Sequence, residues 1–428
     1  MDRVTPRKFA TTPGTRDVLP PESTRLVDVQ ARIRERFRLF GFGEVLTPAL
    51  EYSEVIEEPK LRDASFKLFD PDNQMVMLRP EMTTPIARLV SQRLRNSPLP
   101  HKLSYVLPVY RRADVGRGRS AELYQAGVEV VGSSSPQEDA ATIALLVDVL
   151  GSFGLRAPEN FAVVLGQTAF YEAYLRCVAP EVSPEILRSL AAKDLVAVDA
   201  LATGLSKQAA LGVRGIPRLV GPASEGAILE EAARFTERSG ATEALVALEN
   251  LREILHHLEA HEALSAVILD LGLIGRHNYY TGAVYEAYAS GMGFTIANGG
   301  RYDNLLERFG QDLPATGFAI YLERLLSVLP EEDSSDLVVL VGGGVEGTET
   351  AGILRASGVP VLHLSEDLPL AEALVYTRSV EAGWVLYPGG GDGLVELAPV
   401  REDAGPAEVL PVGEVAGRIM GAARGVAR

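Results

Sequence analysis

Residues 272–326 read GLIGRHNYYTGAVYEAYASGMGFTIANGGRYDNLLERFGQDLPATGFAIYLERLL and carry the strongest patterns in the chain. Apolar and polar residues alternate over 283–288 as they do along a half-buried strand. Gly299 and Gly300 mark a tight passage of the backbone. Over 315–326 the apolar residues recur at helical spacing, which predicts a buried helix at the end of the stretch.

The composition is that of an ordinary folded protein, with 46% hydrophobic and 23% charged residues among 428. This length allows two or three domains with ample core. No apolar run approaches the roughly 20 residues of a membrane-spanning helix. The first residues, MDRVTPRKFATTPG, lack the apolar stretch of a signal peptide, so a cytoplasmic location is expected. The single cysteine, Cys177, excludes an internal disulfide and a zinc site built on several cysteines.

The formal net charge of −16 lowers the expectation of nucleic-acid binding, because proteins that neutralise phosphates usually carry a basic surface. Residues 336–428 lower it further, since 13 acidic residues and 6 arginines give this region a net charge of −7. Short apolar strands alternate there with helical segments, which predicts a small α/β domain. The glycine runs at 342–344 and 389–391 lack the GKS or GKT of a P-loop.

An amphipathic helix is predicted near the N-terminus, where apolar residues recur three and four positions apart and Gly41 follows them. A short strand is expected over 44–47, leading into Pro48. Arginines alternate with the apolar positions of the helix, and we interpret them as a solvated outer face in preference to a nucleic-acid contact. The apolar residues are Leu26, Val29, Ile33, Phe37 and Phe40.

Two strands, over 66–70 and 75–78, are expected to pair through the turn at 71–73 and to lead into LRPEMTTPIAR at 78–88. Glu81 stands where the second strand becomes a helix. Its carboxylate is therefore placed to accept a strong, charge-assisted hydrogen bond from a ligand ammonium group. The alternative is that Glu81 and the threonines after it only cap the helix.

A hairpin of two longer strands follows, over 104–112 and 123–132. Strand alternation puts Gln125, Gly127 and Glu129 on one face, where the glycine would leave room for a small polar ligand. A solvated sheet face is the alternative. The arginines at the end of the first strand and in the loop fit anion binding and an exposed basic loop equally well; they are Arg112, Arg117 and Arg119.

Residues 180–260 are predicted to be mostly helical, with leucines at helical spacing. His257 and His261 lie four positions apart, with Glu253 one turn earlier, a spacing that a metal site could use. No further ligand type frames such a site, so a solvated helix surface is favoured and no metal is expected.

Three segments resemble the three motifs of class II histidyl-tRNA synthetases. The N-terminal helix with Gly41 and the following strand is similar to the first motif, the hairpin to the second, and 315–326 to the third. The similarity covers about residues 10–135 and 265–330. It implies an α+β fold, class II aminoacyl-tRNA synthetase-like, in which an antiparallel sheet is flanked by helices. It also implies dimerisation through the first motif.

The resemblance further implies how the chain is divided into domains. A synthetase-like domain is expected over 1–330, with a helical insertion at about 180–260. The small α/β domain over 336–428 stands where the synthetases carry an anticodon-binding domain.

A histidine pocket is implied by the same resemblance. The LRPEMTTPIAR tract is similar to the one that holds the amino group of histidine, and the tyrosine pair would bracket the imidazole. Without the family match, that pair would be read as half-buried strand aromatics. Arg111 matches the arginine that contacts the α-phosphate of ATP in the synthetases. The implied histidine-binding residues are Glu81, Thr83, Arg111, Gln125, Glu129, Tyr279 and Tyr280.

Several positions depart from the synthetase pattern. Ala113 replaces an acidic residue, and Asn278 replaces an aspartate. The arginine that stabilises charge during adenylate formation falls on Gly275, with Arg276 one position later. A shift of one residue in an extended segment turns a side chain to the opposite face, so Arg276 is a poor substitute.

Tyr321 is a further departure, because the synthetases keep a glycine at this place for the nucleotide. The predicted helix would put Gly317, Tyr321 and Arg324 on one face, with Arg324 matching the arginine that lies against ATP. A tyrosine brings about 150–250 Å² of surface. We therefore expect Tyr321 to crowd the nucleotide site.

With these departures the chain resembles the synthetase paralogues that regulate ATP phosphoribosyltransferase in histidine biosynthesis. The resemblance implies a regulatory subunit without catalytic residues or cofactor, which binds L-histidine as an allosteric feedback effector. The implied partner is the short-form catalytic subunit, with a homodimer of this chain inside a hetero-oligomer and no bound tRNA. Two alternatives stay open: an active histidyl-tRNA synthetase that uses a displaced Arg276, and an assembly scaffold with a vestigial pocket.

Overall fold

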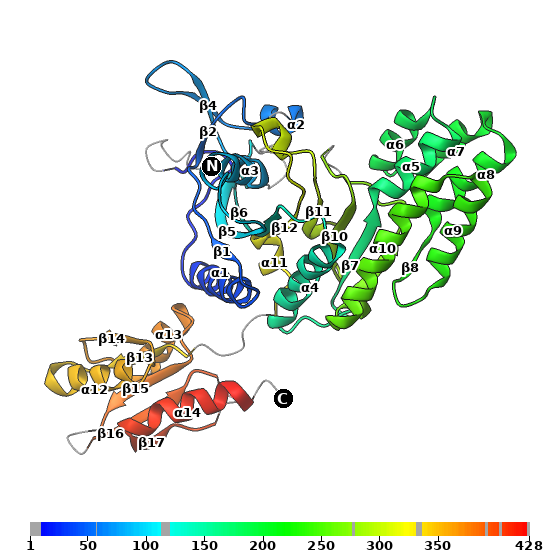
Figure 1. Ribbon diagram of the computed structural model, residues 1–428. Helices are drawn as coiled ribbons and strands as arrows, with labels where there is room; N and C mark the ends of the chain where they lie inside the picture. Colours follow the sequence, from blue (N-terminus) through cyan, green and yellow to red (C-terminus); the bar gives the residue numbers. More distant parts are fainter. Residues whose placement is uncertain are drawn as a thin grey trace, which may run out of the picture. The chain divides into compact units, whose positions relative to one another are not determined.

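The computed structural model describes residues 10–56, 58–112, 120–275, 279–330, 336–389, 393–401 and 405–425, with side chains described as far as residue 421. The chain divides into two compact units, one centred on Leu26–Leu329 and the other on Pro330–Arg428 (Figure 1). Each unit has its own sheet and its own hydrophobic core.

The larger unit is built on a nine-stranded sheet in the order β1-β5-β6-β12-β11-β10-β7-β9-β8. Neighbouring strands run antiparallel except where β1 joins β5 and where β7 joins β9. A large antiparallel sheet with flanking helices is the α+β fold that the sequence predicted. The strands are β1 Gly43–Glu44, β5 His101–Tyr110, β6 Glu122–Val131, β7 Phe161–Gln167, β8 Val220–Pro222, β9 Val267–Asp270, β10 Ala283–Ala289, β11 Thr295–Arg301 and β12 Ala315–Tyr321.

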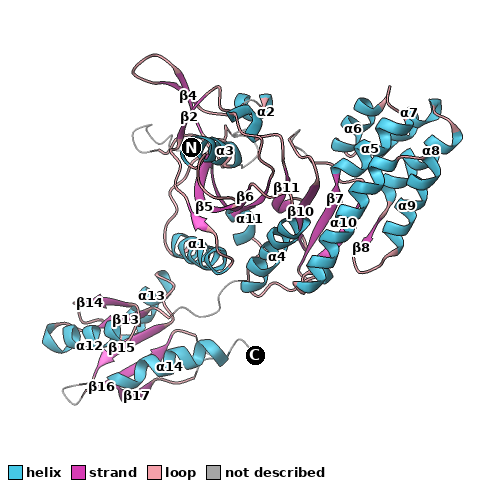
Figure 2. Ribbon diagram, viewed as in Figure 1, coloured by secondary structure: helices cyan, strands magenta, loops and turns pink. Residues whose placement is uncertain are grey.

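One face of this sheet is apolar and packs against the short helix after β12 and against four longer helices (Figure 2). In β6, the side chains of Ala126, Val128 and Val130 are buried in this core. The rings of Phe37 and Phe318 meet edge to face there, with their centroids 6.0 Å apart. Burying a valine or phenylalanine side chain stabilises the folded protein by about 1.5–3 kcal/mol. Because side chains alternate between the two faces of β6, burial of these apolar residues determines which face of the sheet lies against the core. The longer helices are α1 Glu22–Leu39, α4 Pro136–Ser152, α5 Thr168–Val178 and α10 Thr242–Ala260.

The helix predicted over 315–326 is wrong for most of its length. Ala315–Tyr321 forms strand β12, and only Leu322–Leu326 is helical, as α11. The strand is hydrogen-bonded to β6 on one side and to β11 on the other, and this pairing overrides the local apolar spacing. As a result Gly317 and Tyr321 share a strand face, while Arg324 lies on the short helix that follows. The strand expected over 44–47 is likewise reduced, to Gly43–Glu44.

A small sheet in the order β2-β4-β3 leads into the polar side of the larger unit. The strands predicted over 66–70 and 75–78 are confirmed as β3 (Lys67–Phe69) and β4 (Met75–Leu78), which pair antiparallel. Their turn contains Asn73 at a φ of 60°, a conformation that asparagine tolerates better than most residues. The remaining elements are β2 Leu50–Tyr52, α2 Pro59–Asp63 and α3 Thr83–Arg93.

Helices also form most of the stretch between β7 and β9, as the leucine spacing predicted. Leu248 and Leu251 of α10 are buried against its neighbours, whereas His257 of the same helix is half-buried and His261, directly after it, is exposed. Among the described residues, no group of three histidine, cysteine or acidic side chains is arranged to hold a metal ion. The helices that precede α10 are α6 Ser183–Ala191, α7 Leu195–Leu201, α8 Lys207–Gly215 and α9 Ala227–Ser239.

The smaller unit has a five-stranded sheet in the order β14-β13-β15-β16-β17. β13 runs parallel to β14 and β15, while β16 and β17 complete the sheet antiparallel. Within the part of the chain that the structure describes, no helix is long and apolar enough to cross a membrane. The elements are β13 Val338–Val341, α12 Gly344–Ala356, β14 Val361–Leu364, α13 Leu370–Ser379, β15 Trp384–Pro388, β16 Leu394–Pro399, β17 Glu408–Pro411 and α14 Val412–Gly425.

Candidate functional site

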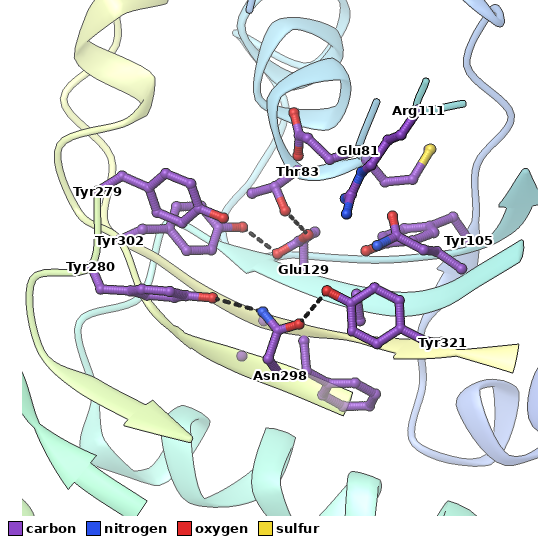
Figure 3. Close-up of a pocket in the computed structure, with 16 residues that line it drawn as sticks. Glu81, Thr83, Tyr105, Arg111, Glu129, Tyr279, Tyr280, Asn298, Tyr302 and Tyr321 are labelled. Carbon is purple, nitrogen blue, oxygen red and sulfur yellow. Dashed lines mark hydrogen bonds between the residues drawn. The ribbon is translucent and has the colours of Figure 1, made fainter. Parts of the chain in front are cut away.

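A pocket lies on the polar face of the nine-stranded sheet and encloses about 440 Å³ of space, part of it open to solvent (Figure 3). Its floor comes from β6, β11 and β12, and the start of α3 and the segment before β10 supply further walls. The structure brings all seven residues of the predicted histidine site together around this pocket: Glu81, Thr83, Arg111, Gln125, Glu129, Tyr279 and Tyr280.

Glu129 lies at the centre of the pocket and is only 1% exposed. Thr83 Oγ1 donates a hydrogen bond to Glu129 Oε1 at 3.0 Å, and the Tyr302 hydroxyl donates to Oε2. Burial raises the pKa of Glu129 to about 8, because it outweighs the stabilisation of the charged form by these two donors. The nearby charge of Glu81 raises that pKa further. A ligand that brings an N–H donor or a positive charge to Glu129 would therefore favour its ionised form.

Glu81 combines the two roles that the sequence left open, since it both lines the pocket and caps α3. Its Oε1 and Oε2 accept the backbone N–H of Thr84 at 3.1 and 3.2 Å. The N-cap position itself, Met82, offers no side-chain acceptor, so Glu81 supplies the cap from one residue earlier. The side chain is 8% exposed. The cap holds its carboxylate in a fixed orientation at the pocket wall.

Two polar atoms in the pocket have no hydrogen-bond partner among the described residues: Gln125 Oε1 and Tyr105 Oη. Both side chains are buried, with 3% and 1% of their surfaces exposed. A buried polar atom without a partner costs about 1–3 kcal/mol, so these atoms mark positions where a ligand's polar groups would be stabilised. Burial also raises the pKa of the Tyr105 phenol well above its ordinary value, so the hydroxyl keeps its proton.

Tyr105 also corrects the expectation of open space above Gly127. The two residues are paired across β5 and β6, and the phenol ring lies directly over the glycine. A Cβ at position 127 would fall 2.4 Å from Tyr105 Oη. Glycine at 127 therefore accommodates the tyrosine, and Tyr105 itself forms part of the pocket wall.

One wall of the pocket is aromatic and contains three tyrosines: Tyr279, Tyr280 and Tyr302. The ring centroids of Tyr279 and Tyr280 are 4.9 Å apart at an interplanar angle of 54°, and those of Tyr279 and Tyr302 are 5.8 Å apart at 74°. Asn298 Nδ2 donates to Tyr280 Oη at 3.4 Å. Sequence reasoning missed Tyr105, Asn298 and Tyr302, whose place in the pocket follows from strand pairing.

The segment that carries the tyrosine pair is anchored to a buried ion pair. Arg301 Nε donates to Asp139 Oδ2 at 2.9 Å, and both side chains are buried. The backbone carbonyl of Arg301 accepts the N–H of Thr281 at 2.8 Å, and Thr281 Oγ1 accepts the N–H of Asp303 at 3.0 Å. These contacts fix the backbone directly after Tyr280.

Gly275 is closed to any side chain in this structure. A Cβ built at this position would lie 2.2 Å from a ring carbon of Tyr280. The place that matches the synthetase arginine therefore holds part of an aromatic ring. Ala113, Arg117, Arg119, Arg276 and Asn278, which the sequence analysis singled out, lie outside the described residues.

Arg111 and Arg324 are both held by backbone carbonyls. Arg111 lines the pocket, and its Nε donates to the carbonyl of Pro80 at 2.7 Å. Arg324 Nη1 donates to the carbonyl of Thr295 at 2.6 Å, and its guanidinium carbon lies 4.3 Å from the centre of the Tyr321 ring. The Arg111 guanidinium is thus placed to pair with an anionic group of a ligand, whereas Arg324 is stacked on a tyrosine.

Comparison with known proteins gives a consistent set of relatives. A family model described as histidyl-tRNA synthetase matches residues 14–325. The ATP phosphoribosyltransferase regulatory subunit of Rubrobacter xylanophilus is 65% identical over 415 residues, which cover 97% of this chain and 98% of the relative. The subunit of the same name from Symbiobacterium thermophilum is 36% identical over 390 residues, covering 88% and 96%.

Solved structures agree with the fold. The crystal structure of an ATP phosphoribosyltransferase regulatory subunit/histidyl-tRNA synthetase from Bacillus halodurans has a TM-score of 0.76 at 30% identity, and the match covers 90% of this chain and 99% of that one. A histidyl-tRNA synthetase from Nostoc sp. PCC 7120 has a TM-score of 0.81 at 19% identity, covering 96% and 99%. The second similarity concerns the fold alone.

Proposed function

The chain belongs to the family of ATP phosphoribosyltransferase regulatory subunits, which share the histidyl-tRNA synthetase fold, and from this premise we propose that its pocket binds free L-histidine as a feedback effector. Catalysis lies in the partner chain, the ATP phosphoribosyltransferase catalytic subunit. We further propose that this partner is the short-form enzyme and that two copies of the regulatory chain pair inside the hetero-oligomer, without tRNA.

The observation that carries the proposal is the set of polar groups that converge on one small pocket. Histidine has an ammonium group, a carboxylate and an imidazole, and each has a complementary group here. Glu81 and Gln125 Oε1 are acceptors for the ammonium group, and Arg111 is a cation for the carboxylate. Glu129 is an acceptor for an imidazole N–H, beside the aromatic wall that contains Tyr279.

Three features support a sensor that does not form an adenylate. Gly275 has no room for a side chain that could stabilise negative charge on a nucleotide. Tyr321 fills space at the pocket end, and Arg324, which could stack on a nucleotide base, is stacked on Tyr321. Histidine would instead act by binding two states of the hetero-oligomer with different affinities.

The proposal is tested on the purified full chain with two measurements in parallel. Calorimetry with L-histidine is expected to show saturable binding, with D-histidine as the matched control that binds more weakly. Histidine-dependent ATP–pyrophosphate exchange is expected to stay at background. In the complex reconstituted with a short-form catalytic subunit, L-histidine is expected to inhibit phosphoribosyl transfer. Exchange well above background would identify an active synthetase, and absence of histidine binding would leave an assembly scaffold.

Tyr105 gives a finer test of the pocket. The change Tyr105→Phe removes only the hydroxyl, which has no hydrogen-bond partner within the described part of the chain. It is expected to weaken L-histidine binding by about tenfold, since one hydrogen bond contributes about 1–1.5 kcal/mol. The matched control is Tyr110→Phe on the same strand, outside the pocket lining, which is expected to leave the dissociation constant within about twofold. Equal affinities for the two variants in calorimetry would exclude Tyr105 as a ligand contact.

A further inference from the structure

We propose that Tyr321 limits the length of the ligand that the pocket accepts. The pocket would then bind free histidine and reject histidine derivatives that carry a bulky substituent on the carboxyl group. The inference rests on the proposed function, since it specifies which chemical forms of histidine are sensed. A pocket of this kind would distinguish the free amino acid from forms in which the carboxyl group is joined to a larger group.

The pocket face of β12 changes abruptly in size along the strand. Alternation sends Gly317, Ala319 and Tyr321 to this face, and all three line the pocket. The Glu129 carboxylate lies over Gly317, where a Cβ would fall 2.0 Å from Oε2, and Ala319 presents only a methyl group. Tyr321, by contrast, fills the end of the strand with a phenol ring.

Tyr321 is fixed at its hydroxyl end by a chain of side chains (Figure 3). Its Oη donates to Asn298 Oδ1 at 2.7 Å, and Asn298 Nδ2 donates to Tyr280 Oη at 3.4 Å. Both polar ends of the Asn298 amide are therefore engaged, which orients it in one direction only. A ligand that pushed Tyr321 aside would break this chain.

The ring of Tyr321 is also held on its flat side. The Arg324 guanidinium carbon lies 4.3 Å from the ring centre, and a second aromatic ring, Phe294, lies 5.1 Å from the same carbon. Arg324 Nη1 is in turn held by the Thr295 carbonyl at 2.6 Å. Because the ring is held both at its hydroxyl and across its face, it forms a fixed wall of the pocket.

The amino-acid end of the ligand is the end that meets this wall. Tyr321 stands directly opposite Gln125 in the pairing of β12 with β6, and Gln125 Oε1 has no hydrogen-bond partner among the residues that the structure describes. Figure 3 places Tyr321 and Tyr105 at one end of the pocket and Tyr279 and Tyr280 at the other, with the imidazole acceptor Glu129 between the two ends. A group attached to the carboxyl carbon would therefore project toward Tyr321.

Three ligands separate the loss of carboxylate charge from added bulk: L-histidine, L-histidine methyl ester and L-histidine 2-naphthylamide. The methyl ester and the naphthylamide both lack the carboxylate, so their comparison reports bulk alone. For the unaltered protein, calorimetry is expected to give a dissociation constant at least about 100-fold higher for the naphthylamide than for the methyl ester. In Tyr321→Ala the ratio is expected to fall below about 10, whereas Tyr321→Phe keeps the ring and the unaltered ratio.

Each result decides the inference. Equal affinities of the two derivatives for the unaltered protein, or an unchanged ratio in a folded Tyr321→Ala variant, would overturn it. Thermal unfolding shows whether that variant is folded; if it is not, Tyr321→Leu, which also removes the ring but keeps more apolar surface, takes its place with the same expected ratio. If L-histidine itself does not bind the unaltered protein, the proposed function fails first. If L-histidine binds and the naphthylamide binds as well as the methyl ester, the proposed function stands and the proposed role of Tyr321 is wrong.

Discussion

Glu81→Gln is expected to weaken L-histidine binding by at least about 100-fold, or about 3 kcal/mol, while the protein stays folded. Glu81 is 8% exposed, so an ammonium group beside its carboxylate would exchange water for a charge-assisted hydrogen bond in a poorly solvated site. A neutral amide keeps the shape but loses the charge, and removing one partner of a buried charged pair costs several kcal/mol. Calorimetry with L-histidine measures the change.

The choice of glutamine follows from the second role of Glu81. The side chain caps α3 through the Thr84 N–H, and alanine would remove that cap at a cost of about 1 kcal/mol. Glutamine keeps an oxygen acceptor for the same N–H. The matched control is Glu122→Gln at the start of β6, outside the pocket lining, which is expected to change the affinity by less than about twofold. If Glu81→Gln binds L-histidine with unchanged affinity, Glu81 is not a contact of the bound histidine.

A second large effect is expected from Glu129→Gln, on the pH dependence of stability. The pKa of Glu129 is about 8 in the folded protein, against an ordinary value of 4.5. Between these pH values the folded protein holds a proton that the unfolded chain has released. The free energy of unfolding therefore falls as pH rises, by about 1.4 kcal/mol per pH unit, until the pH passes about 8. Glutamine does not ionise and removes this contribution.

Denaturant unfolding of the ligand-free chain at pH 5, 7 and 9 tests whether the free energy of unfolding falls as pH rises. Near pH 5 the two proteins are expected to be similarly stable, and at pH 9 Glu129→Gln is expected to be more stable by several kcal/mol. The same variant is expected to lose most of its affinity for L-histidine, because the amide cannot take the ionised form that an imidazole N–H favours. Parallel pH profiles for the two proteins would show that Glu129 does not hold its proton in the folded state. Glu122→Gln again serves as the control.

Much of the site could be predicted from local pattern. The alternation along β6 is enough to put Gln125 and Glu129 on a face opposite the apolar core, and the sequence around Glu81 marks a strand that turns into a helix. Both inferences need only neighbours in sequence, and the structure agrees with both placements.

The rest depended on pairing between distant segments. Over 315–326 the apolar spacing fits a helix, yet β6 and β11 supply hydrogen bonds on both edges and make a strand of its first seven residues. Tyr105 could not be recognised without the register that sets it over Gly127. Asn298 and Tyr302 likewise reach the pocket through the pairing and position of β11, which no local pattern specifies.

The packing of Tyr280 against Gly275 links four positions of the chain. An arginine at 275 would need the Tyr280 ring to move. The Tyr280 hydroxyl is hydrogen-bonded to Asn298, however, and Asn298 is hydrogen-bonded in turn to Tyr321. A single substitution at any one of these positions would therefore disturb the contacts of the others. The effects of substitutions at these four positions are therefore expected to be epistatic, so that the effect of a change at 275 depends on the residues at 280, 298 and 321.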